Sequence, residues 1–285
     1  MIISGKWNGR EYKLLNLIGS GSFGRVYRVI DEEGNIKAIK ISEDLFSITN
    51  EYNAMVRLNG LSFIPRAYDF DDWHIRGQIY HFIVMDYIQG KNLKEVGSSN
   101  EISSKTVFKI GKILINILER INGLGYRYTD IKLENILIDV KGKIYFVDFG
   151  SLTEEGMPTK EYTPSYNINS WKTEYNANYE RSILFSVTMV MVSLIGQKEY
   201  NPLVFNLEQV IDRIDKFPLK RKEKQFLADG LRGKFFNLSQ YIDSLVLLLK
   251  DEKNCNSLNK IDYILIASIV SFVFVIILGV KSILS

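Results

Sequence analysis

The hydrophobic pattern of the chain changes once along its length, and this change constrains the fold more than any other feature. Strand-like alternation of apolar and polar residues runs through residues 11–87, as in "GRVYRVID" and "IKAIKI", with one helical pattern at residues 50–58. From about residue 101 onward, apolar residues recur at helical spacing, as in "VFKIGKILINILERI". The sequence therefore predicts an α+β fold in which a strand-rich lobe precedes a helical lobe.

Size and composition leave one large or two small domains open, because 285 residues can bury a substantial core. The 36 Lys and Arg residues nearly balance the 33 Asp and Glu residues, and a net charge of +3 gives no strong signal for nucleic-acid binding. A single cysteine excludes an internal disulfide and any multi-cysteine metal site, as expected in a reducing compartment.

Residues 263–280, "YILIASIVSFVFVIILGV", carry no charge. At about 1.5 Å per residue they span roughly 27 Å, close to the hydrocarbon thickness of a bilayer. A buried core helix usually keeps polar residues on one side, whereas this segment has only Ser268 and Ser271. The segment is therefore expected to be a transmembrane helix, with residues 251–261 as a juxtamembrane tether. Cys255 in this tether is expected to be an unmodified linker thiol, and acylation close to the membrane is the alternative.

The first residues, "MIISGKWNGREYK", lack the apolar core of an export signal. We therefore expect a single-pass, tail-anchored membrane protein whose residues 1–260 are cytoplasmic.

Gly19, Gly21 and Gly24 form a G-x-G-x-x-G pattern followed by Val26. A dinucleotide-binding loop shares this pattern, but it opens a helix. Here the chain continues as the alternating segment "RVYRVIDEEGNIKAIKI", so the glycines are predicted to lie between two strands of a hairpin. Backbone amides without side chains could there approach phosphate oxygens closely.

Charged residues that could act on a nucleotide follow at intervals. Lys40 lies on a predicted strand with the small residue Ala38 on the same face, and Glu51 lies in the helical pattern that follows. A carboxylate on that helix could hold the ammonium group toward phosphates.

A second group of polar residues lies in "YRYTDIKLENILID", which contains Asp130, Lys132 and Asn135, and Asp148 follows the strand-like "IYFV". Asn135 and Asp148 offer hard oxygen ligands, which suit magnesium better than zinc or copper.

Together these residues resemble the signature set of the protein kinases, in order and spacing, over about residues 11–250. The resemblance is closest to bacterial, eukaryotic-like (Hanks-type) serine/threonine kinases in a small membrane-anchored form. It rests in particular on Lys132, two residues after Asp130, and on "TPSY" at residues 163–166, which places Thr163 against both. The resemblance implies a two-lobed protein-kinase fold, with an N-lobe at about 11–87 and a C-lobe at about 88–250.

Five catalytic residues are implied by the resemblance: Lys40, Glu51, Asp130, Lys132 and Asn135. Lys40 would pair with Glu51 and contact the α- and β-phosphates of ATP, Asp130 would orient and deprotonate the acceptor hydroxyl, and Lys132 would neutralise the γ-phosphoryl group. Asn135 would hold magnesium together with Asp148. The acceptors would be alcohols of protein substrates, and self-association would allow autophosphorylation.

The implied nucleotide-binding set surrounds these groups. Met85 would be the gatekeeper beside the base, and residues 86–88 of "FIVMDYIQGKNL" would face adenine. The full set is Ile18, Gly19, Ser20, Gly21, Ser22, Phe23, Gly24, Val26, Ala38, Lys40, Met85, Asp86, Ile88, Leu137 and Asp148.

Four positions depart from the family pattern. Tyr128 and Thr129 stand where a His-Arg pair precedes the catalytic aspartate. The family's histidine packs under the Phe of the "DFG" motif and its arginine receives an activation-segment phosphate, so Tyr128 is expected to pack against Phe149 while Thr129 removes a regulatory receiver. Arg127 is an alternative receiver.

Ser170 and Ser182 lie where the family has the glutamate of "APE" and an anchoring aspartate, which brace the substrate platform. We interpret the chain as a working kinase with altered regulation. A nucleotide-binding pseudokinase scaffold and a small-molecule kinase of the same fold are the alternatives.

Overall fold

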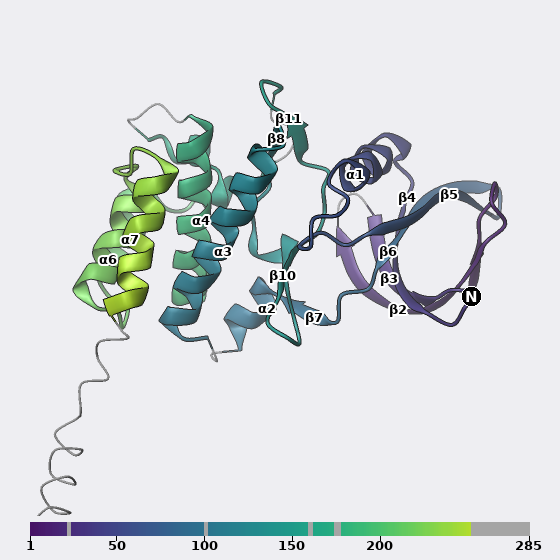
Figure 1. Cartoon of the computed structure of the whole chain (residues 1–285), viewed down its shortest axis with the longest axis horizontal. Helices are drawn as coiled ribbons and strands as arrows, with labels where there is room; N and C mark the ends of the chain where they lie inside the picture. Colours follow the sequence, from purple (N-terminus) through teal and green to yellow (C-terminus); the bar gives the residue numbers. More distant parts are fainter. Residues whose placement is uncertain (22–23, 100–101, 159–161, 174–177, 252–285) are drawn as a thin grey trace, which may run out of the picture.

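The computed structural model describes residues 1–21, 24–99, 102–158, 162–173 and 178–251. A lobe of strands with one large helix lies beside a lobe of helices, as Figure 1 shows. The predicted strand-rich N-lobe and helical C-lobe are thereby confirmed. The predicted transmembrane helix at 263–280, residues 252–261 of the tether, and Cys255 within it lie outside the described residues.

The N-lobe is built on a six-stranded antiparallel sheet with the strand order β1-β2-β3-β4-β6-β5. Its strands are β1 (Ile2–Ser4), β2 (Glu11–Gly21), β3 (Gly24–Ile30), β4 (Ile36–Ser42), β5 (Ala67–Ile75) and β6 (Gln78–Asp86). As predicted, the glycine motif falls where β2 turns into β3.

Both faces of β4 are buried from Ala38 to Ser42, and the alternation along this strand decides which side chains face the C-lobe. Ile39 and Ile41 pack into a small core inside the curved sheet with Phe82 and Val84 of β6. Ala38 belongs instead to the large core that continues into the C-lobe. Because side chains two residues apart share a face, the period of the strand directs Lys40 to the same side as Ala38.

The first ten residues close the curved sheet, which the sequence did not indicate. β1 pairs with β2 at one edge, and Ile3 is fully buried in the small core. The turn after β1 then bonds to β5 at the opposite edge: Lys6 N–H donates to the Asp72 carbonyl at 2.9 Å, and the Asp71 carboxylate accepts from the backbone N–H groups of Trp7 and Asn8. The sheet thus begins at Ile2, before the start expected at residue 11.

Helix α1 (Leu45–Arg57) begins earlier than the pattern at 50–58 indicated. Asp44 caps it by accepting a hydrogen bond from the Ser47 N–H at 3.0 Å. Ile48, Glu51 and Met55 are buried along one face at helical spacing. This face packs on β5 and β6, so Glu51 points into the protein.

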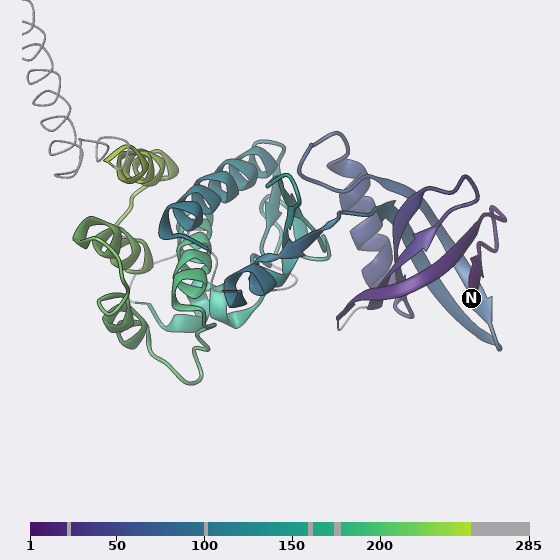
Figure 2. The ribbon, with the colours of Figure 1, turned by 90° about the horizontal axis from the view of Figure 1, so that it is seen from below.

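The C-lobe consists mainly of helices that lie side by side (Figures 1 and 2). They are α2 (Leu93–Ser98), α3 (Ser104–Asn122), α4 (Tyr179–Gly196), α5 (Leu207–Ile214), α6 (Arg221–Leu231) and α7 (Leu238–Asp251). Gly111 lets α3 approach α4 closely, because a Cβ there would lie 2.4 Å from the sulfur of Met191.

Among the described residues, α4 is the one helix long and apolar enough to cross a membrane. Two thirds of this helix (67%) is buried inside the protein, and the buried part includes every residue from Ile183 to Leu194. Its apolar character is therefore explained by its place at the centre of the C-lobe.

Short elements carry or flank the polar residues Asp130, Lys132, Asn135 and Asp148. They are β7 (Gly90–Asn92), β8 (Tyr126–Tyr128), β9 (Ile136–Asp139), β10 (Ile144–Phe146), β11 (Leu152–Glu154) and three 3₁₀ turns, η1 (Leu133–Asn135), η2 (Pro164–Tyr166) and η3 (Ile168–Trp171). Val147 N–H donates to the Asn135 carbonyl at 2.9 Å. That bond brings the segment before Asp148 against the loop that follows Asp130.

Candidate active site

Lys40 lies between two carboxylates from other parts of the fold. Its ammonium group is hydrogen-bonded to Glu51 Oε2 and lies 3.5 Å from Asp148 Oδ1. Lys40 and Glu51 are only 7% and 3% exposed, whereas the Asp148 side chain is 36% exposed. The sheet, helix α1 and the segment after β10 thus converge on one cation.

Burial and charge act against each other in this group. Burial raises the pKa of Glu51 to about 7, although the attraction of Lys40 pulls it down. Burial alone would lower the pKa of Lys40, but Glu51 and Asp148 outweigh it and raise that pKa. The lysine therefore stays cationic.

Asp130 is the centre of a second cluster. Its Oδ2 accepts hydrogen bonds from Lys132 Nζ at 2.6 Å and from Asn135 Nδ2 at 3.1 Å, and its Oδ1 accepts one from the Thr163 hydroxyl at 2.6 Å. Asp130 is 7% exposed, and its backbone N–H donates to Ser151 Oγ at 3.2 Å. The carboxylate is therefore fixed from several sides.

Asn135 and Asp148 are the two residues expected from the sequence to hold magnesium. Asn135 Nδ2 also donates to the Asp130 carbonyl at 3.1 Å, so the amide nitrogen is directed at Asp130 and the amide oxygen stays available as a ligand. In the part of the chain that the structure describes, no cluster of three or more His, Cys, Asp or Glu side chains could hold a metal. A pair of oxygens completed by phosphates is the arrangement typical of magnesium in nucleotide sites.

The three glycines of the hairpin have different surroundings. Gly24 has a φ of +141°, and a Cβ there would lie 2.3 Å from the Ile41 carbonyl oxygen. The conformation of the backbone therefore requires glycine at this position, whether or not a ligand binds. A Cβ on Gly21 would meet nothing within 4 Å, which leaves its backbone open to a ligand. Ile18 and Ser20 lie beside Gly19 on β2, and Ser22 and Phe23 lie outside the described residues.

The expected adenine-facing residues lie around the segment that joins the lobes. Ala38 pairs in register with Met85, and both are buried. The side chain of Asp86 does not point toward a base. Its carboxylate accepts from the Arg66 N–H at 2.9 Å and from the Tyr68 hydroxyl at 2.7 Å, and its own N–H donates to the Arg66 carbonyl at 3.0 Å, so recognition of a base by Asp86 would have to use its backbone carbonyl. Ile88 follows two residues later, and Leu137 lies on β9 opposite β7.

Tyr128 does pack against Phe149, edge to face, with the ring centroids 6.0 Å apart. It also does something the sequence did not suggest. Its hydroxyl lies within hydrogen-bond distance of the Val147 and Asp148 carbonyls, at 3.2 and 3.1 Å. Burial raises the pKa of Tyr128 well above its ordinary value, so the hydroxyl remains a donor that fixes the backbone at Asp148. The Thr129 hydroxyl donates to the Ser151 carbonyl at 3.2 Å.

Other polar contacts brace the segment that carries Thr163. Ser186 Oγ of α4 donates to the Tyr166 carbonyl at 2.7 Å, and Trp171 Nε1 donates to the Ser165 carbonyl at 3.1 Å. The Ser182 hydroxyl bonds within its own helix, where it donates to the carbonyl of Asn178, the N-cap residue of α4. Sequence reasoning missed Ser151, Trp171 and Ser186. Of these three residues, only Ser151 could have been found from the sequence, because it directly follows the "DFG" motif.

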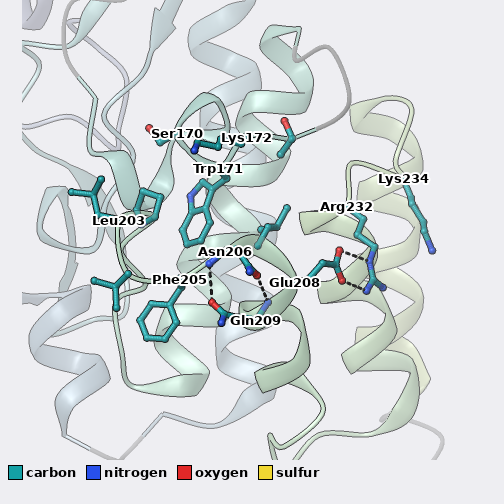
Figure 3. A pocket seen from close by; sticks show the side chains of 14 residues that line it. Ser170, Trp171, Lys172, Leu203, Phe205, Asn206, Glu208, Gln209, Arg232 and Lys234 are labelled. Carbon is teal, nitrogen blue, oxygen red and sulfur yellow. Dashed lines mark hydrogen bonds and ion pairs between the residues drawn. The ribbon is translucent and has the colours of Figure 1, made fainter.

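Ser170 lines a cavity of about 830 Å³ in the C-lobe, together with residues before and within α5 and with Arg232 and Lys234 after α6. Figure 3 shows two pairs in its wall, Asn206 with Gln209 and Glu208 with Arg232. None of the residues predicted for catalysis lines this cavity. The candidate active site is therefore the pair of clusters around Lys40 and Asp130.

Residues 12–231 match the sequence profile of the protein kinase domain. The chain belongs to the protein kinase family. It is 30% identical over 242 residues to the serine/threonine-protein kinase YabT of Bacillus subtilis (strain 168), an alignment that covers 82% of this chain and 70% of YabT. This family membership and its serine/threonine kinase relatives make the chain a protein serine/threonine kinase.

Two eukaryotic kinases are similar over about half of the chain. A RAC family serine/threonine-protein kinase homolog of Dictyostelium discoideum is 28% identical over 159 residues, which cover 52% of this chain and 34% of the homolog. The serine/threonine-protein kinase ppk11 of Schizosaccharomyces pombe (strain 972 / ATCC 24843) is 29% identical over 148 residues, which cover 49% and 46%. The chain thus spans less than half the length of these two relatives.

Proposed function

We propose that this kinase transfers the γ-phosphoryl group of ATP to serine or threonine hydroxyls of proteins, with Asp130 as the residue that receives the acceptor's proton. The observation that carries the proposal is the set of bonds at Asp130. A carboxylate has about four lone-pair positions. Among the described residues, Lys132, Asn135 and Thr163 take three of them, which leaves one on Oδ1 for an acceptor hydroxyl.

The Thr163 contact supports an alcohol acceptor. A threonine hydroxyl already lies 2.6 Å from Asp130 Oδ1, a normal O–H···O⁻ distance. A second hydroxyl on the same oxygen would have the geometry that proton transfer requires. Lys132, which lies 2.6 Å from Oδ2, would remain close enough to balance charge on the transferring group.

ATP and magnesium are the ligands that we assign to the Lys40 side of the site. Lys40 would contact the phosphates, held by Glu51, and the backbone at Gly21 would lie over them. Asn135 and Asp148 would hold magnesium. The ion supplies neutralisation of phosphate charge when bound.

Purified protein with ATP and magnesium should phosphorylate a generic protein acceptor such as myelin basic protein, and chelation of magnesium should abolish the reaction. Small alcohols at millimolar concentration, assayed in parallel, should not be phosphorylated. Transfer to the small alcohols but not to the protein would indicate a small-molecule kinase. ATP binding without any transfer would indicate a scaffold.

We further propose that the chain is anchored at the cytoplasmic face of a membrane through residues 263–280. The support comes from the sequence: an uncharged apolar stretch long enough to span the bilayer, and a kinase that requires cytosolic ATP. Lys253 and Lys260 before the segment, against Lys281 after it, add a weak positive-inside bias. Anchored copies would be concentrated in two dimensions, which favours self-association and autophosphorylation.

Fractionation of cells that express the full chain tests the anchor. The protein should stay with membranes after a carbonate wash, and replacement of Val270 and Val275 by lysine should release it, because charges at the bilayer centre are costly. Val140→Lys, at an exposed position of the C-lobe, is the control and should stay in the membrane fraction. Full-length protein in the soluble fraction would contradict the anchor.

A further inference from the structure

Two adjacent carboxylates tie the segment after Phe149 to two different parts of the active site. Glu154 Oε1 lies 3.1 Å from Arg57 Nη1, at the end of α1, the helix that carries Glu51. Glu155 Oε1 lies 3.0 Å from Arg127 Nη2, on β8, the strand that leads directly to Asp130. One short stretch of chain therefore links the elements that hold both candidate clusters.

Arg127 is the better enclosed of the two cations. Its side chain is 28% exposed, against 50% for Arg57. Its guanidinium carbon lies 4.7 Å from the ring centroid of Tyr179, the first residue of α4. The Glu155 side chain is 59% exposed, so solvent still screens the Arg127–Glu155 pair, and what distinguishes the pair is the strand to which it fixes the segment after Phe149.

Backbone hydrogen bonds fix the same segment as this salt bridge. Arg127 pairs in register with Thr153 in the two-stranded sheet of β8 and β11. Glu155 N–H donates to the Gly125 carbonyl at 2.8 Å, and Met157 N–H donates to the Glu154 carbonyl at 3.1 Å. The salt bridges and these backbone bonds hold the same few residues.

We propose that Glu154 and Glu155 hold the segment after Phe149, which corresponds to the activation segment of the kinase family, in its working position without a phosphate group, and that Arg127 is a positioning residue for catalysis. The inference rests on the proposed function and concerns its regulation. A phosphate on this segment would need a cationic receiver. Here position 129 is threonine, and Arg127 already binds a carboxylate of the segment itself. Activity should therefore not depend on phosphorylation of the segment.

Charge reversal in the full-length chain tests the pair. Arg127→Glu and Glu155→Arg should each lower kcat for phosphorylation of myelin basic protein by about five- to tenfold, with the KM for ATP within about twofold of wild type. The double variant, with the two charges exchanged, should recover at least half of the wild-type kcat.

The matched control is the Arg232–Glu208 pair in the C-lobe, which has a similar length of 2.7 Å and side-chain exposures of 37% and 63%. Its reversal should change kcat less than about twofold. Wild type treated with a protein phosphatase should keep at least half of its initial rate.

Amide hydrogen exchange gives a measurement that does not need activity. The amides of Glu155 and Met157 should exchange faster in Arg127→Glu and return to the wild-type rate in the double variant. The inference is wrong if both single reversals keep wild-type kcat, if the exchanged pair recovers neither kcat nor protection, or if dephosphorylation lowers the rate tenfold or more. If the wild-type protein transfers no phosphate but the amide exchange rates of the variants change as described, the proposed function is refuted. The role of the Arg127–Glu155 pair in holding the segment after Phe149 then still stands.

Discussion

Asp130→Asn is expected to lower the rate of phosphoryl transfer by about 10²–10⁴, the usual contribution of a positioned acid–base group. Asparagine has nearly the same shape but cannot accept the acceptor's proton. It also turns one of its two head-group atoms from acceptor into donor, so the hydrogen bond with Thr163 has to reverse, with the Thr163 hydroxyl accepting from the amide nitrogen. Initial rates with saturating ATP and a protein acceptor measure the loss.

Two comparisons make this result specific. Asp212→Asn replaces an exposed carboxylate on α5 and should keep the wild-type rate. ATP affinity, measured by calorimetry, should change little in Asp130→Asn, because Lys40, Glu51 and Asp148 are untouched. Equal rates for Asp130→Asn and wild type would show that another group takes the proton.

Lys40→Met is expected to destabilise the folded protein by about 3–5 kcal/mol, because it leaves the buried carboxylate of Glu51 without its cation. Methionine fills a volume similar to that of lysine, so the loss of stability would be caused by the missing charge more than by poorer packing. Lys40→Met/Glu51→Leu removes both charges and should recover most of the free energy of unfolding. Urea unfolding of the nucleotide-free protein measures all three forms.

The pH dependence of this variant has a definite sign. The pKa of Glu51 is raised by burial from its ordinary 4.5 to about 7, and loss of Lys40 raises it further. A carboxyl group whose pKa is higher in the folded than in the unfolded state favours folding at low pH, and that contribution is lost as the pH rises through the folded pKa. Lys40→Met should therefore be most destabilised, relative to the double variant, at pH 8 and least at pH 5. If the difference in stability between Lys40→Met and the double variant did not depend on pH, the unpaired Glu51 carboxylate would not be the cause of the destabilisation.

The sequence predicted those parts of the site that depend on local pattern. Alternation placed Ala38 and Lys40 on one face of β4, and helical spacing placed Glu51 on the inner face of α1, because each periodicity fixes direction within one element. The hairpin of glycines was predictable for the same reason. The requirement for glycine at position 24 was not predictable, because it arises from the close approach of the Ile41 carbonyl on the neighbouring strand.

Contacts between distant segments could not be predicted in this way. Glu154 and Arg57 are separated by 97 residues, and Ser186 and Tyr166 by 20, and neither pair belongs to a repeating pattern. The tyrosine at position 128 was expected to fill space under Phe149, but its hydroxyl acquires a role only because the Val147 and Asp148 carbonyls, directly after β10, lie beside it. Such polar contacts depend on how loops meet in three dimensions.

The closure of the N-lobe by its first ten residues bears on how this kinase can be handled in solution. The similarity to the protein kinase domain starts at residue 12, so a cut chosen from that similarity would remove β1 and the turn that bonds to Asp71 and Asp72. Such a cut would empty the site of Ile3 and leave the edge of β2 unpaired. Unpaired strand edges recruit strands from other molecules. Loss of solubility in a shortened protein would then reflect an opened sheet and not a defect in catalysis.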